Sequence, residues 1–132
     1  MRILTMAMIF SLIAGSVPAQ PPLGEVDEID DALLAIGLAD EIRKQCPEIS
    51  GRTVKGYRII LGLRDRAREL GYSDAQIDAY RKSDVEKSRL KAEGAAYVRA
   101  QGLDMTVPAD WCKLGKSEIA KKSQIGVLLR VN

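Results

Sequence analysis

The sequence predicts an all-α protein, a compact bundle of about five helices that follows a short leader. Apolar residues recur at helical spacing through most of residues 28–122. Serine and proline signals that start helices, and glycine signals that end them, separate these stretches. No segment alternates convincingly between apolar and polar residues in the manner of a half-buried strand. Residues 20–132 are therefore expected to form a single α-helical domain.

Residues 1–19 have the layout of a secretory signal peptide. A basic start at Arg2 precedes fifteen uncharged, mostly apolar residues at 3–17, and small or modest side chains precede an expected cut after Ala19. The apolar run is shorter than the roughly 20 residues that span a bilayer. We therefore expect cleavage, no stable membrane span afterwards, and a periplasmic location. An uncleaved amino-terminal anchor is the alternative.

The first predicted helix covers about residues 28–46. Acidic residues gather at its start, and Arg43 and Lys44 lie in its last turn, which matches the helix dipole. Its apolar positions form two stripes, which predicts packing on more than one side. A second helix, from residue 51 or 52 to residue 70, has one broad apolar face and is our candidate for the centre of the fold. Gly71 follows it as a left-handed residue.

Two capping boxes define the next two helices. Ser73-Asp74-Ala75-Gln76 and Ser83-Asp84-Val85-Glu86 each place a serine three residues before a Gln or Glu. They predict a short helix to about Lys82, followed with no real loop by a helix to about Gln101. Gly102 is expected to close the second of these helices.

The last predicted helix begins near Pro108 and ends near Lys121-Lys122, and residues 123–129 either continue it or form one more turn. Six glycines lie inside helical patterns, where each costs up to about 1 kcal/mol relative to alanine in an exposed helix. Close helix packing is the expected reason for them, and hinges or close approach of a ligand are the alternative. They are Gly37, Gly56, Gly62, Gly94, Gly115 and Gly126.

The two cysteines predict a structural disulfide. Cys46 ends the first predicted helix and Cys112 opens the last, so a bridge formed in an oxidising compartment would link them. A loop of this size is worth about 4 kcal/mol in the chain-entropy model. Redox-active pairs usually sit two residues apart, and two thiolates without histidine make a poor metal site. Trp111 is expected to pack over the sulfurs, with ligand stacking as the alternative.

The absence of histidine from the sequence restricts its chemistry. Serine–histidine and cysteine–histidine nucleophile systems and histidine-based zinc sites are excluded. We assign no catalytic residue, no cofactor and no metal, so the sequence leaves an enzyme open and favours a non-catalytic protein. Loss of Arg2 with the leader leaves 19 bases against 18 acids, which gives no electrostatic footprint for nucleic acid.

Charge is unevenly distributed along the nearly neutral chain. Residues 20–42 carry seven acids and no base, whereas residues 43–68 carry eight bases and two acids. The candidate binding residues are Arg58, Arg64 and Arg68, on a basic helix face that could meet an anionic partner. The alternative is that the acidic first helix lies beside the basic second one, so that the charges meet inside the molecule.

Several short strings carry a family resemblance. Glu-Ile-Asp-Asp-Ala-Leu at 28–33, Cys-Pro-Glu-Ile-Ser at 46–50 and Ile-Ala-Lys at 119–121 resemble a family of exported alphaproteobacterial proteins of the Rhodobacteraceae type. That family is catalogued as a domain of unknown function, number 5333. The resemblance covers nearly all of residues 20–132 and implies export and the disulfide. It implies no activity and no site residues.

We expect a non-catalytic, exported interaction or binding module of the bacterial periplasm that docks on an envelope protein or an anionic envelope polymer. A carrier of a small apolar ligand is the alternative, and a small histidine-free enzyme a third possibility. The module predicts salt-sensitive binding and a filled core, and the carrier predicts an internal apolar cavity. The enzyme predicts a cleft of converging carboxylates with shifted pKa values.

Overall fold

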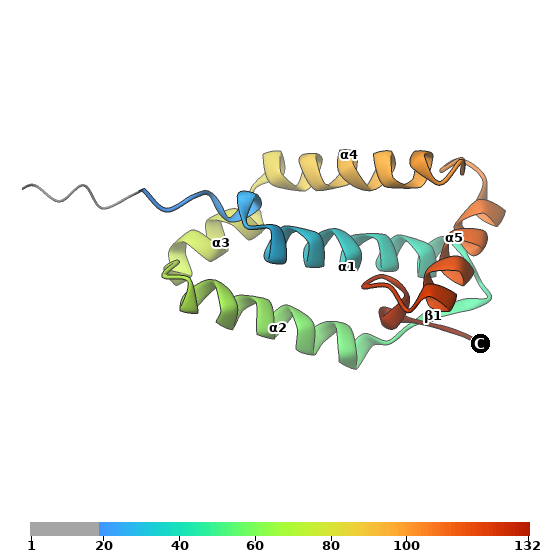
Figure 1. Ribbon diagram of the computed structural model, residues 1–132, viewed down its shortest axis with the longest axis horizontal. Helices are drawn as coiled ribbons and strands as arrows, with labels where there is room; N and C mark the ends of the chain where they lie inside the picture. Colours follow the sequence, from blue (N-terminus) through green and yellow to red (C-terminus); the bar gives the residue numbers. More distant parts are fainter. Residues whose placement is uncertain (1–18) are drawn as a thin grey trace, which may run out of the picture.

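The computed structural model describes residues 19–132, so the predicted leader at residues 1–19 lies, except for Ala19, outside the described residues. Within residues 19–132 the chain forms five α-helices, two 3-10 turns and a small two-stranded sheet (Figure 1). The elements are η1 (Leu23–Glu25), α1 (Asp27–Gln45), β1 (Ile49–Gly51), α2 (Thr53–Glu69), α3 (Asp74–Lys82), α4 (Asp84–Ala100), α5 (Pro108–Lys121), η2 (Gly126–Leu128) and β2 (Leu129–Val131). The predicted all-α bundle is confirmed.

Helix α1 occupies the centre of the fold. Figure 1 shows it between α4 and α2, with α5 against its carboxyl-terminal end. Five of its residues are buried, whereas α2 buries one, Ala67. The prediction that the second helix forms the centre is therefore wrong. An apolar face shows what a helix can bury, and on α2 much of that face is left in solvent: Ile60 and Leu61 remain 45% and 44% exposed.

The main core lies where α1, α4, α5 and the short sheet meet, and Ile42, Leu114 and Leu129 are almost fully buried there. Gly115 permits this contact, because a Cβ on it would lie 2.7 Å from Ile42 Cγ2 and 2.5 Å from Ile49 Cδ1. Close packing is thus the reason for this glycine, whereas a Cβ at Gly94 would make only an ordinary van der Waals contact with Leu38 at 3.4 Å.

The expectation about glycines also fails at Gly56, where a Cβ would come no closer than 4.0 Å to Leu128, and at two further positions. A Cβ added at Gly37 or Gly62 would meet open space among the residues that the structure describes. Helix packing therefore does not require glycine at either position.

A two-stranded antiparallel sheet closes the chain. Ile49 pairs with Val131, Ser50 with Arg130, and Gly51 with Leu129. The sequence analysis predicts no strand, and this is wrong, because three-residue strands are too short to show an alternating pattern. Residues 126–128 form the single extra turn that was one of the two alternatives after α5.

The chain returns over α5 through a very close approach. Lys122 ends α5 in the left-handed conformation, with φ of 52°. At Gly126 a Cβ would lie 1.9 Å from the carbonyl oxygen of Glu118. A side chain at residue 126 would therefore push η2 and β2 away from α5.

The predicted disulfide is present. Cys46 directly follows α1 and Cys112 lies in the first turns of α5, with 5.1 Å between their Cα atoms. Cys46 and Trp111 are both buried in the main core, and the indole Nε1 of Trp111 donates a hydrogen bond to the carbonyl of Met105 at 2.9 Å. Trp111 is thus a core residue, as expected.

The capping signals are confirmed, one of them in part. Ser73 Oγ accepts from the amide of Gln76 at 3.1 Å, and Gln76 Oε1 accepts from the amide of Ser73 at 2.8 Å. Ser83 Oγ accepts from the amide of Glu86, but the carboxylate of Glu86 accepts instead from Arg89. Gly71 and Gly102 adopt the positive φ that their places after helices require.

One carboxylate lies inside the core. Glu118 is fully buried, and its Oε1 accepts a hydrogen bond of 2.6 Å from the hydroxyl of Tyr97. Its Oε2 has no hydrogen-bond partner within residues 19–132. Burial and the hydrogen bond to Glu118 raise the pKa of Tyr97 to about 12, because both favour the neutral phenol.

Replacing both Cys46 and Cys112 with Ala should lower the free energy of unfolding by about 4 kcal/mol, because the bridge constrains a loop that spans 66 positions. Urea unfolding followed by circular dichroism measures the change. Reductant should lower the free energy of unfolding of the wild-type protein by a similar amount. It should leave the free energy of unfolding of the double variant unchanged. Equal stability of variant and wild type would contradict the role given to the disulfide.

Stability should fall as pH rises from about 10 to about 12. Burial raises the pKa of Tyr80 to about 12, as burial and Glu118 do for Tyr97. The unfolded chain releases these protons near pH 10, while the folded protein keeps them until about pH 12. The free energy of unfolding therefore falls as the pH rises through this window. Urea unfolding at a series of pH values measures the fall. In a variant with Phe at both positions, the free energy of unfolding should fall less over this pH range. An equal fall in the variant and the wild type would show that the two tyrosines do not cause it.

Candidate functional site

The three predicted binding residues all lie on α2, but in different surroundings. Arg68 Nε donates to Asp74 Oδ1 at 2.8 Å and its Nη1 donates to Asp65 at 3.0 Å. The hydrogen bond from Arg68 also holds the pKa of Asp74 below its usual range. Arg64 lies 3.7 Å from Asp74 and farther from Asp78, and Arg58 has no carboxylate of residues 19–132 within ion-pair distance. The structure therefore does not bring the three arginines to one uncompensated face.

The charges of the first and second helices meet at one ion pair. Arg66 Nε donates to Glu28 Oε1 at 2.8 Å. The deeper contact involves α4, where the two Nη atoms of Arg89 donate to Asp30 at 2.5 and 3.0 Å. Asp30 is only 14% exposed, so the acidic start of α1 is partly an internal network.

Arg89 of α4 links three helices, because it donates to Asp30 of α1 and to the hydroxyl of Tyr80 of α3. It also donates to Glu86 and Glu93, and its hydrogen bond with Asp30 is the main cause that raises its pKa. A Cβ at Gly24 would come within 2.8 Å of this guanidinium, so a side chain at residue 24 would require the end of the Arg89 side chain to shift. Sequence reasoning missed this network because the partners are 59 residues apart.

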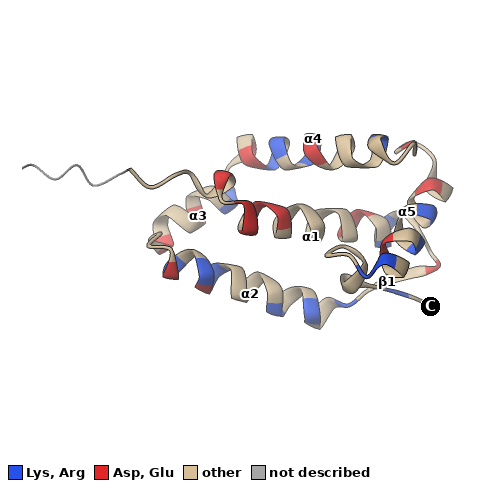
Figure 2. Cartoon of the chain, in the orientation of Figure 1, with Lys and Arg blue, Asp and Glu red and all other residues tan. Residues whose placement is uncertain are grey.

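A basic hollow forms at the start of α2, and we use this name for the space lined by Arg52, Lys55, Arg58 and Arg130. Its volume is about 620 Å³, and none of the residues lining it is acidic. None of the four cations forms an ion pair with any part of the chain from residue 19 onward. Figure 2 shows basic residues along this end of α2 and on the carboxyl-terminal strand nearby.

Backbone hydrogen bonding and strand pairing position two of these cations. Arg52 Nε donates to the carbonyl of Leu129 at 3.2 Å, and Arg130 Nε donates to Ser50 Oγ at 3.1 Å. Pairing of β1 with β2 places Arg130 opposite Ser50. Arg130 could not be found from the sequence, since it reaches the hollow through a strand pairing that the sequence does not reveal.

The helix itself adds positive potential to the basic hollow. Helix α2 has no side-chain cap and no acidic residue in its first turn, so its first amides and its dipole face the hollow without compensation. Together with the four side chains, this arrangement can attract and hold an anion.

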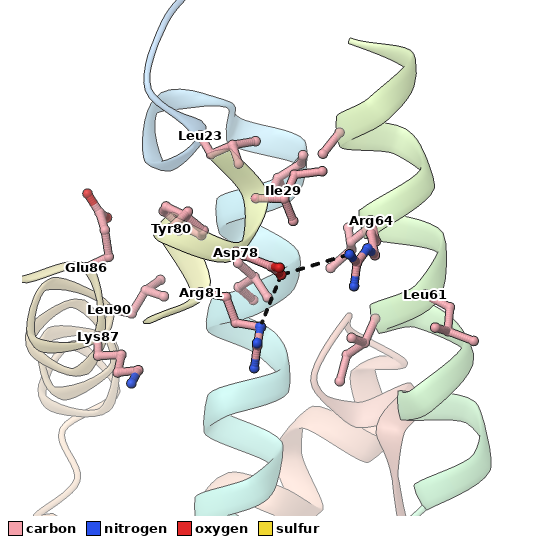
Figure 3. A pocket seen from close by; sticks show the side chains of 15 residues that line it. Leu23, Ile29, Leu61, Arg64, Asp78, Tyr80, Arg81, Glu86, Lys87 and Leu90 are labelled. Atoms are coloured by element: carbon pink, nitrogen blue, oxygen red, sulfur yellow. Dashed lines mark ion pairs between the residues drawn. The ribbon is translucent and has the colours of Figure 1, made fainter. Parts of the chain in front are cut away.

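An apolar pocket of about 260 Å³ lies at the opposite end of α2. It is enclosed by η1, α1, α2, α3 and α4, and charged side chains from α2, α3 and α4 stand at its mouth (Figure 3). Arg64 is one of them. An apolar cavity is what the carrier alternative predicts, although this one opens to the surface.

Residues 19–132 contain neither a metal-binding cluster nor a membrane-spanning helix. No group of three or more His, Cys, Asp and Glu residues is placed to hold a metal ion. No helix in this part of the chain has both the length and the apolar content to cross a membrane.

The chain is a small all-α domain that carries a disulfide, a basic hollow and an apolar pocket. Disulfides of this kind persist outside a reducing cytosol. The chain belongs to the family of unknown function DUF5333, whose model matches residues 21–130. No curated protein and no solved structure matches the chain. Membership of the family with number 5333, predicted from the short strings, is thus confirmed.

Arg89→Met should lower the free energy of unfolding by about 2 kcal/mol, because it leaves the largely buried Asp30 without its charged hydrogen-bond donor. Lys91→Met is the matched control, since Lys91 is an exposed residue of the same helix with no ion pair within residues 19–132. Urea unfolding compares the two variants. Equal effects would show that the Arg89 network contributes nothing specific.

Proposed function

We propose that this protein is a non-catalytic binding module, exported to the periplasm of an alphaproteobacterium, that docks on an anionic polysaccharide of the cell envelope. The observation that carries the proposal is the basic hollow, where four cations converge with no acidic residue among its lining. Elsewhere on α2, as at Arg68, cations are matched by carboxylates of the protein itself. The hollow is thus a place where an external anion would be bound.

The openness of the hollow favours a polymer over a single small anion. Exposed ion pairs contribute only about 0–1 kcal/mol each, so one phosphate or carboxylate would be held weakly. A chain with repeated anionic groups can engage Arg52, Lys55, Arg58 and Arg130 together, and the separate contributions then add.

Exposed apolar side chains beside the cations favour a polysaccharide. Val54 and Tyr57 are 67% and 62% exposed, and Tyr57 lines an adjoining hollow that shares Gly51, Arg52 and Thr53 with the basic one. A sugar ring presents an apolar face that can pack on a tyrosine while its acidic groups reach the cations. An acidic peptide is the outcome to be distinguished by experiment.

The chemistry of the hollow supports binding rather than catalysis. Its lining contains no carboxylate and no thiol, so it offers neither a general base nor a strong nucleophile. The disulfide and the predicted leader support export.

A double charge reversal, Lys55→Glu with Arg58→Glu, should weaken binding to polygalacturonate at least tenfold, because two attractive contacts become repulsive. Biolayer interferometry on the immobilised polymer measures this, and binding by wild type should weaken as sodium chloride is raised. Lys91→Glu with Arg99→Glu is the control, since it makes the same charge change at exposed positions of α4 that form no ion pair within residues 19–132.

Two results would contradict the proposal. One is equal binding to neutral dextran, which would exclude recognition of the anion. The other is tighter, equally reversal-sensitive binding to polyglutamate, which would make an acidic protein the partner.

A further inference from the structure

The apolar pocket at the other end of α2 is a second candidate site. Its walls are mainly aliphatic and include Ile29 and Leu33 of α1, Leu61 and Leu63 of α2, and Leu90 of α4. Since one water takes up about 30 Å³ of liquid, a volume of about 260 Å³ holds roughly nine groups of that size. The space therefore suits a medium-length alkyl chain.

The pocket exists because α3 holds α2 away from α4. The left-handed turn at Gly71 and the cap at Ser83 place this nine-residue helix between them. Ile60 and Leu61 consequently face the pocket while nearly half of their surface remains in solvent. A bound apolar chain would cover them, and removal of that surface from water would favour binding.

Arg64, at the mouth of the pocket, is incompletely paired. Its Nε is buried without a hydrogen-bond partner in the described chain, and its nearest carboxylate oxygens lie at 3.7 and 3.9 Å. These distances are too long for hydrogen bonds. Arg68, one turn later, makes two hydrogen bonds of 2.8 and 3.0 Å. The contrast identifies Arg64 as a cation with unused donors above an apolar cavity.

The other charged groups at the mouth leave it net positive. Figure 3 shows Asp78 between Arg64 and Arg81, and its carboxylate lies 3.9 and 3.8 Å from them. Glu86 already accepts a hydrogen bond from Arg89, while Lys87 adds a further cation. An anionic group on a ligand would share Arg64 with Asp78, and Arg81 and Lys87 would offset the repulsion between the two anions.

We propose that this pocket binds a single-chain amphiphile with a carboxylate head, a fatty acid of medium length. The alkyl chain lies among the aliphatic side chains of α1, α2 and α4. The carboxylate accepts hydrogen bonds from the guanidinium of Arg64, whose planar donors match it. This site is separate from the basic hollow and does not depend on the function proposed for it.

Titration calorimetry with sodium decanoate tests the proposal on protein made from the full chain with its disulfide intact. Decan-1-ol and decyltrimethylammonium, used below their aggregation limits, provide neutral and cationic heads on the same chain. Wild type should bind decanoate saturably, one per protein, and at least tenfold more tightly than either of the other two.

Three variants separate the two parts of the site. Arg64→Gln should weaken decanoate at least tenfold and leave decan-1-ol unchanged, whereas Leu61→Asn should weaken both ligands. Arg68→Gln, one turn away and outside the pocket lining, should change neither. Circular dichroism confirms that each variant is folded.

Failure of decanoate to bind saturably would overturn the pocket, and unchanged decanoate affinity in Arg64→Gln would overturn the head-group site. The Lys55 and Arg58 double reversal should leave decanoate affinity unchanged, so the result is independent of the polysaccharide experiment.

Discussion

The covalent link between the end of α1 and the start of α5 is the constraint on which the rest of the structure depends. It fixes two helix ends with their Cα atoms 5.1 Å apart, and Gly115 then lets Ile42 and Ile49 pack directly on the backbone of α5. Ile42 and Ile49 belong to the main core, which is built mostly of aliphatic side chains. The short sheet seals the same end and carries the chain back beneath α2.

The buried apolar residues form the main core and a smaller cluster of Leu23, Ile29, Ala67 and Tyr72, and α2 contributes only Ala67 to them. The helix is held by the sheet at its start and by α3 at its finish, and it buries a single residue between them. At the start, uncompensated cations gather around its amino terminus. At the finish, its apolar side chains face a gap that α3 spans but does not fill. Both candidate sites thus arise from incomplete packing of the same helix.

Local signals in the sequence predict local structure well here. The helices, the serine caps and the left-handed glycines follow from patterns within a few residues of one another. The disulfide follows from the presence of two cysteines and from the predicted export to an oxidising compartment. What depends on distant contacts could not be predicted: the β1–β2 pairing, the Asp30–Arg89 network, and the place of α2 at the edge.

The candidate sites show the same division. The charge pattern alone predicts Arg58 as a candidate binding residue. Arg130 lines the same hollow, but it is brought there only by the pairing of the two strands. The pattern also groups Arg64 with Arg68. The structure distinguishes them, because Arg68 donates a hydrogen bond to a carboxylate of α3 and Arg64 lies too far from one to do so. A count of charges along a helix cannot tell which of them the protein itself will neutralise.

The shallow anchorage of α2 also affects how the molecule fluctuates. A helix with one buried side chain opens at a lower free energy than the core, and its ends stay tethered because the disulfide encloses it in a covalent loop.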